Sequence, residues 1–202
     1  MSAPALISVD VNYGVPFANP VQRSQIVAVQ INFDQAATIL ADAFTLENTG
    51  LFTPGSNLLP SSAIKYTPGN ANSVLLTFDA GPVAQGLIND GVVKRNGPAA
   101  AVNGDSLANG TYKLTIDPAK VFNNDGNLAG DNQFGEAYSD KFFRMFGDSD
   151  GDGDVDGTDT VAFRRAQVAY NAALDWDGNG SVTIGTDSTN FASNSSKKRR
   201  VF

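Results

Sequence analysis

Apolar and polar residues alternate with a period of two along much of the first roughly 140 residues. The clearest stretches are LISVDVNY from residue 6, SQIVAVQINFD from residue 24, SVLLTFD from residue 73 and TYKLTID from residue 111. This pattern is typical of half-buried antiparallel strands with one face in water. The side chains expected to face the core are Ile7, Val9, Val11, Tyr13, Val27, Val29, Ile31, Phe33, Val74, Leu76, Phe78, Tyr112, Leu114 and Ile116.

The stretches between these strands, such as NTGLFTPGSN and NNDGNLAGDNQFG, are dense in turn-forming residues. The chain of 202 residues holds 20 Gly and 9 Pro, and 42% of its residues are hydrophobic, enough for a real core. About seven strands without a long helical pattern predict a mainly β fold, an antiparallel β-sandwich.

The pattern changes after residue 140. KFFRMF, residues 141–146, is short and apolar, and we expect either a last strand or a plug that docks the following acidic segment onto the β-structure. TDTVAFRRAQVAY, residues 158–170, is the first convincing helix. The helical stripe expected in it consists of Val161, Arg165 and Val168, flanked by Ala162, Ala166 and Ala169.

Charge is concentrated in this last part of the chain. The segment from Asp148 to Asp187 holds nine Asp and two Arg, and so carries the entire net charge of -7. A nucleic-acid partner is not expected for so acidic a segment. The basic run KKRR, residues 197–200, is expected to be a solvated, frayed end.

The acidic stretch GDSDGDGDVDGTD, residues 147–159, follows the spacing of a calcium-binding loop of the EF-hand type. Calcium takes six to eight oxygen ligands, and carboxylates at the first, third and fifth positions converge as the backbone turns at the glycine in sixth position. The ligands predicted for this first loop are Asp148, Asp150, Asp152, Asp154 (through its carbonyl), Asp156 and Asp159.

A second stretch, DWDGNGSVTIGTD, repeats the spacing from residue 175. Its twelfth position is Thr186, and an acid, Asp187, comes one residue late. Either Asp187 closes a longer loop or this site is weaker. Val155 and Val182, both at the eighth position, are expected to let the loops pair back to back. The ligands predicted for the second loop are Asp175, Asp177, Asn179, Ser181, Thr183 and Asp187.

A solvated Asp/Gly linker is the alternative interpretation, but two matching loops with a helix between them favour a metal site. Two calcium ions are therefore expected, and magnesium less so because it keeps its waters. Clustered carboxylates repel one another, so metal binding should be coupled to folding of this segment. Asp instead of Glu at the closing position predicts weak binding, in the range of about 10⁻⁴–10⁻³ M typical of extracellular modules.

Catalysis is not expected. The chain has no His and no Cys, which excludes imidazole and thiol chemistry and His/Cys zinc sites. No apolar run reaches the roughly 20 residues of a membrane-spanning helix, and the opening residues show no signal peptide.

Residues 24–131 resemble the bacterial Ig-like domains of surface proteins, through INFDQAA, GTYKLTI and the turn DGNLAG. The two loops resemble the F-hand repeats of dockerins, the calcium-binding modules of secreted bacterial proteins. The dockerin resemblance implies a cohesin-like partner contacting Gly157, Thr158, Arg164 and Arg165, although Gly157 is a poor contact residue and the arginines would equally suit a solvated helix face. STNFASNSSKKRR, after the second loop, lacks the apolar stripe of a strong helix.

The expected organisation is an N-terminal strand or extension at residues 1–22, an Ig-like sandwich at 23–140, a dockerin-like pair of calcium loops at 141–192 and a basic tail at 193–202. The expected function is a noncatalytic, calcium-stabilised structural, adhesion or interaction module, secreted or at the cell surface of a bacterium. The alternatives are docking to a cohesin-like partner, a fibre subunit that donates its first strand to a neighbour, and a carbohydrate-binding module marked by a row of exposed aromatic residues.

Overall fold

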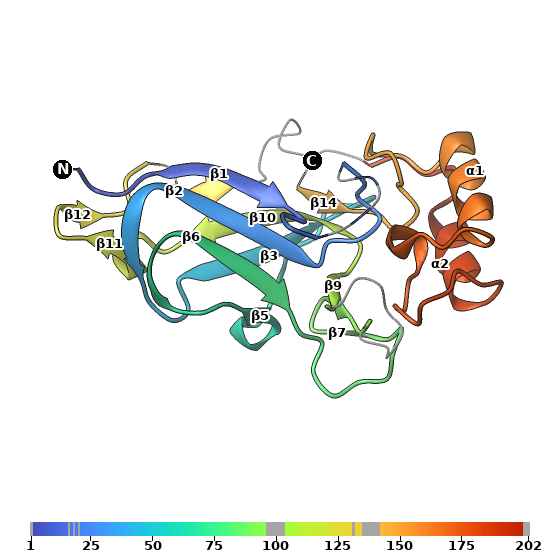
Figure 1. The fold of residues 1–202 in the computed structure, drawn as a ribbon, viewed down its shortest axis with the longest axis horizontal. Helices are drawn as coiled ribbons and strands as arrows, with labels where there is room; N and C mark the ends of the chain where they lie inside the picture. The colour runs from blue at the N-terminus through green and yellow to red at the C-terminus, as the bar shows by residue number, and fades with distance from the viewer. Residues whose placement is uncertain are drawn as a thin grey trace.

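The computed structural model describes residues 2–15, 17, 19, 21–95, 104–130, 132–134 and 142–199. The fold is mainly β, with antiparallel sheets, as the sequence predicts. We call the described residues up to 134 the β body and residues 142–199 the C-terminal part. Figure 1 shows an elongated molecule with the N-terminus at one end and both labelled helices at the other.

The strands are β1 (Leu6–Val11), β2 (Ala28–Ile39), β3 (Phe44–Gly50), β4 (Asn57–Leu58), β5 (Ile64–Lys65), β6 (Gly69–Phe78), β7 (Ile88–Asn89), β8 (Val92–Val93), β9 (Ser106–Leu107), β10 (Gly110–Ile116), β11 (Val121–Asn123), β12 (Gly126–Asn127), β13 (Gln133–Phe134) and β14 (Phe143–Arg144). The helices are α1 (Gly157–Ala166) and α2 (Thr186–Asn194), with short 3-10 turns η1 (Ser61–Ala63), η2 (Pro118–Lys120) and η4 (Ala172–Leu174).

Two larger sheets enclose one hydrophobic core. The first runs in the order β12-β11-β2-β6-β5, with β1 also paired to β2, and the second in the order β13-β10-β3-β4, with β14 paired to β10. Buried residues of β2 and β6 from the first sheet and of β3 and β10 from the second belong to the same cluster. A third, small sheet has the order β7-β8-β9.

The predicted core positions on β2, β6 and β10 are confirmed, since all of them lie in this core, whereas Val27, just before β2, does not. Val27 is buried in a separate cluster with Phe17, Ala172 and Ala173. The prediction is wrong for Ile7 and Tyr13, which are 64% and 57% exposed. A register shift between Leu6 and Ser8 turns Ile7 outward, and Tyr13 lies in the turn after β1 has ended.

The apolar run before the acidic segment serves as both of the predicted elements. Phe143 and Arg144 form β14 on β10, and Phe142 is buried in the core of the β body. Phe143, Met145 and Phe146 are buried in a second cluster with residues of the C-terminal part. The run therefore joins the two cores. Lys141 lies outside the described residues.

The first helix begins where predicted but ends at Ala166 instead of Tyr170, so Val168 lies beyond it, and the predicted stripe is not its buried face. Val161 is 47% and Val168 92% exposed, whereas Phe163 and Ala166 are buried. The helix begins in a capping box in which the Asp159 side chain returns to the backbone of Asp156. Asp159 thus faces the loop, and Phe163, four residues on, lies on the same buried face.

The chain end is also more ordered than the sequence predicts. STNFASN lies within α2, which buries Phe191 against the second cluster. Val155 accepts the N–H of Ser196 and donates its own to Lys197, so its backbone pairs with the chain end instead of with the second loop. Arg199 is buried over the Phe143 ring at 4.5 Å. The predicted frayed end is therefore wrong up to Arg199, and Arg200 lies outside the described residues.

Buried polar contacts lock the C-terminal part onto the β body. The Arg144 guanidinium is fully buried, lies 4.4 Å over the Trp176 ring and donates to the carbonyl of Ser24. It also donates to the side chains of Gln25 and Asn109. The C-terminal part is thus held by packed and hydrogen-bonded contacts, which a flexible tether would not supply.

Candidate metal centre

In the first acidic loop, buried carboxylates at the two ends accept hydrogen bonds from the loop's own backbone. Asp148 accepts the backbone N–H groups of Gly151 at 2.6 Å and Gly153 at 3.1 Å. Asp159 accepts the N–H groups of the second and ninth loop residues at 2.8 and 2.9 Å. Both glycines have positive φ angles, of 79° and 96°, which residues with a side chain adopt only at a cost. The backbone therefore curls around its own carboxylates.

The second loop repeats this bonding. Asp175 accepts the N–H groups of Gly178 at 2.8 Å and Gly180 at 2.9 Å. Asp187 accepts those of the second and ninth loop residues at 2.7 and 2.8 Å. The glycine φ angles are again positive, at 70° and 91°. In its hydrogen bonds the second loop is a copy of the first, and Asp187 occupies the place of Asp159.

The second loop has one residue more than the first, and this residue lies just before α2. Three residues, Ile184, Gly185 and Thr186, separate the ninth residue from the closing acid, where the first loop has two. Helix α2 begins at Thr186, so Asp187 is its second residue, whereas Asp159 is the third residue of α1. Ile184 is 90% exposed. The surplus residue therefore projects outward while the closing carboxylate keeps its position.

Carboxylates gather in three groups, and within each group one ligand atom per residue lies within 4.8 Å of the others. The groups are Asp148 with Asp150 and Asp152, Asp154 with Asp156 and Asp159, and Asp175 with Asp177 and Asp187. The first loop therefore divides its six acids into two groups instead of gathering all of them at one point.

The remaining predicted ligands belong to the second loop. Thr183 donates its N–H and hydroxyl to Asp187 of the third group, and the side-chain amide oxygen of Asn179 accepts the N–H and hydroxyl of Ser181. In the first loop, the exposed Asp156 caps α1.

Four of the carboxylates are completely buried. Asp148, Asp159, Asp175 and Asp187 are each 0% exposed. Lys198 pairs with Asp154 at 3.9 Å near the surface. The guanidinium group of Arg23 interacts electrostatically with Asp148, and that of Arg95 with Asp175 and Asp177. The nine carboxylates of the two loops still outnumber these cationic side chains, and backbone N–H groups add no full charge, so the excess of negative charge favours a bound cation.

The pKa shifts have the same physical origin. Burial and, to a smaller extent, the nearby negative charge of Asp159 raise the pKa of Asp148 to about 7, although the N–H groups of Gly151 and Gly153 lower it. Burial is likewise the main cause that raises the pKa of Asp150, Asp154, Asp177 and Asp187. Without a cation, these groups resist ionisation.

The donor set fits a hard cation. The groups offered are carboxylate, amide, hydroxyl and backbone oxygens, which calcium prefers, on loops that curl tightly enough to bring them together. The residues that would hold the ions are the six predicted for each loop, with Asp187 as the closing acid of the second.

Residues that the sequence did not single out support both loops, and all of them except Tyr170 lie in the β body. The Arg23 N–H donates to the carbonyl of Asp148, and the Asn19 side chain donates to the carbonyl of Ser149. Around the second loop, Gln25 and Arg95 donate to the carbonyl of Asp175, Gln85 donates to that of Asp177, and the Tyr170 hydroxyl donates to the Asp175 carboxylate. No local pattern marks most of these side chains, because their partners lie far along the chain.

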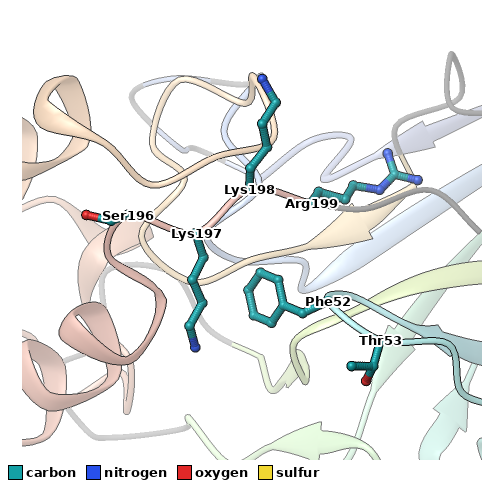
Figure 2. Close-up of a pocket in the computed structure, with 6 residues that line it drawn as sticks. All are labelled: Phe52, Thr53, Ser196, Lys197, Lys198 and Arg199. Carbon is teal, nitrogen blue, oxygen red and sulfur yellow. The ribbon is translucent and has the colours of Figure 1, made fainter.

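A hollow of about 640 Å³ lies beside the chain end and is lined by Phe52, Thr53 and residues 196–199. Figure 2 shows that Lys197 and Lys198 point to opposite sides. Lys197 lies 4.8 Å over the Phe52 ring, and Lys198 pairs with Asp154. The basic groups do not converge, so the hollow is not a built anion site.

No family model, no curated protein and no solved structure matches this chain. Neither α-helix of the described chain is long and apolar enough to cross a membrane.

Proposed function

We propose that the protein is a noncatalytic, calcium-stabilised structural module, with an Ig-like sandwich joined to an EF-hand-type, dockerin-like pair of calcium loops. The observation that carries this proposal is the repeated bonding of Asp148 with Asp159 and of Asp175 with Asp187, four buried carboxylates in two matching loops. Calcium would offset the negative charge that the nearby arginines, Arg23 and Arg95, leave uncompensated.

The role of calcium in this proposal is to lock the C-terminal part onto the β body. Both loops are hydrogen-bonded on their outer side to β-body residues, among them Arg23 and Gln85. Filling the loops from within would therefore stabilise the junction as well as the loops. Such constitutive stabilisation suits an extracellular or cell-surface protein of a bacterium, where calcium is abundant and weak sites are filled.

Thermal unfolding with calcium and with a chelator tests this function. The expected result is a calcium-dependent rise in Tm that magnesium at the same concentration does not reproduce. Light scattering in the same experiment reports whether loss of calcium causes self-association. An identical Tm with calcium and with chelator would contradict the proposal.

Docking to a cohesin-like protein is a second candidate, and the outer surface of α1 favours it. Gly157, Thr158, Arg164 and Arg165 are all exposed, beside the exposed apolar Val161. Pull-down from bacterial extracellular fractions, with calcium and with chelator, tests it. Replacing both arginines with alanine should abolish capture, and capture by the doubly substituted protein would count against this surface.

The other two alternatives gain less support. β1 is paired along its length with β2 of its own chain, so it is already in use where a fibre subunit would donate it. The exposed aromatic side chains of the described residues include Tyr13 and Tyr170, which lie in different parts of the molecule and form no row for a sugar.

A further inference from the structure

One small element of the β body packs against the outer side of the second loop and forms hydrogen bonds with it. β7 and β8 form a hairpin within the small sheet β7-β8-β9; we call this hairpin the ribbon, and Gln85, Gly86, Lys94 and Arg95 the ribbon base. The Gly86 N–H donates to the carbonyl of Lys94 at 2.8 Å, which closes the base. Figure 1 shows β7 and β9 at the end of the β body that faces the C-terminal part.

Two hydrogen bonds join the ribbon base to neighbouring residues of the second loop, one at a backbone carbonyl and one at a side chain. Gln85 donates to the carbonyl of Asp177 at 2.7 Å and to that of Arg95 at 3.1 Å, and so bridges the loop and the ribbon. The Trp176 indole N–H donates to the carbonyl of Gly86 at 3.0 Å. Asp177 is thus held on its outer side while its carboxylate lies within the acidic group.

Close packing leaves the loop no room to move independently of the ribbon. A Cβ atom on Gly178 would lie 2.3 Å from the Arg95 carbonyl oxygen, and one on Gly86 would lie 3.3 Å from the Asp177 Cβ. Arg95, which is fully buried, also donates to the carbonyl of Asp175 at 3.2 Å. The backbone that carries two of the clustered carboxylates therefore rests directly on the ribbon base.

We propose that the ribbon base is the outer wall of the second metal site, so that a divalent cation in the second loop and the ribbon stabilise each other. This inference rests on the proposed calcium-binding function. Gln85 is a positioning residue: it touches no ion, but it fixes the backbone from which the Asp177 carboxylate projects. Because coupling between two sites is reciprocal, an intact ribbon base strengthens metal binding, and metal slows opening of the ribbon.

The first loop provides an internal comparison, because a different segment holds it. Its outer backbone bonds to Asn19 and Arg23, near the N-terminus. Damage to the ribbon base should therefore weaken the second site and leave the first unchanged.

Terbium luminescence isolates the second loop. The chain has one tryptophan, Trp176, and it is the second residue of that loop, where it can transfer energy to a bound Tb³⁺. Gln85 is exposed, so Gln85→Met removes the donor at similar length without opening a core. Gln35→Met is the matched control, since Gln35 also donates to backbone carbonyls, those of Ser2 and Ala3 at the far end of the molecule.

The expected result is Tb³⁺ affinity about three- to tenfold weaker in Gln85→Met and unchanged in Gln35→Met, as loss of one hydrogen bond predicts. Calcium calorimetry on Gln85→Met combined with Asp177→Ala should give the same first-site affinity as Asp177→Ala alone. In the unsubstituted protein, hydrogen exchange at the Gly86 and Lys94 amides should slow when Tb³⁺ or calcium is added, and this slowing should vanish in Asp177→Ala.

The possible failures are distinguishable. The ribbon inference is overturned if the unsubstituted protein binds Tb³⁺ and Gln85→Met binds it as tightly. It is also overturned if Gln35→Met weakens Tb³⁺ binding as much as Gln85→Met does. Either result leaves the calcium proposal intact. Metal binding without any change in exchange at Gly86 and Lys94 also overturns the ribbon inference. Absence of both Tb³⁺ luminescence and calcium heat in the unsubstituted protein overturns the proposed function itself.

Discussion

The Asp187 carboxylate accepts the backbone N–H of Trp176 at 2.7 Å, closing the second loop as Asp159 closes the first by accepting the N–H of Ser149 at 2.8 Å. The equivalence holds although Asp187 comes one residue later in its loop. Thr186, which occupies the twelfth position of the spacing, is exposed. The hydrogen bonding thus assigns the closing role to Asp187.

Asp187→Ala should therefore remove one calcium site, while Thr186→Ala should keep both. Replacing Asp187 removes a carboxylate from the acidic group and the acceptor of two backbone N–H groups, whereas replacing Thr186 removes neither. Calorimetric stoichiometry measures the difference. Loss of a site in Thr186→Ala with retention in Asp187→Ala would reverse the assignment.

The buried face of α1 gives a prediction about stability. Phe163→Ala should lower the free energy of unfolding by about 3–5 kcal/mol, because it leaves a cavity beside Phe191, whose ring centroid is 4.4 Å away. Val168→Ala, at a position 92% exposed, should change it by less than about 0.5 kcal/mol. Urea unfolding in calcium compares the two variants, and similar effects from both would contradict the burial of Phe163 in α1 and the exposure of Val168 just beyond it.

How far the sequence predicts the structure differs from one element to the next. The sequence predicts the register of each loop because its aspartates and glycines lie within thirteen residues of one another. It does not predict which face of α1 is buried, because that face is set by Asp159, which turns inward to close the loop, and Phe163 lies on the same face. The bulge that turns Ile7 outward depends on pairing with β2, more than 20 residues away.

The supports outside the loops were the least predictable part of the site. Gln25 donates to Asp175 across a separation of 150 residues, and Gln85 to Asp177 across 92. Both are ordinary polar side chains in their local sequence. Only the three-dimensional packing of the C-terminal part on the β body gives them a role.

The raised pKa of Asp148 predicts how pH acts on the calcium-free protein. Burial raises this pKa to about 7 from 3.8, so the folded state holds a proton that the unfolded state releases. The free energy of unfolding should therefore fall as pH rises from about 4 to about 7. Above about pH 7 it should stay constant at its lowest value. Calcium should reverse the trend, because it binds the ionised form.

Melting temperatures at pH 5 and pH 7.5, each with chelator and with calcium, test this prediction. Asp148→Asn is the matched control, since it keeps the side-chain shape without the titrating proton and should make the fall in the chelator series smaller, leaving the part due to the other carboxyl groups with a raised pKa. A chelated protein that is more stable at pH 7.5 than at pH 5 would contradict the sign.

The most direct test of the central claim is calorimetric titration of calcium into chelator-stripped protein. The account predicts binding heat with a stoichiometry of two, reduced to one by Asp150→Ala in the first loop and to one by Asp177→Ala in the second. Absence of calcium heat, or heat that survives both substitutions made together, would contradict it.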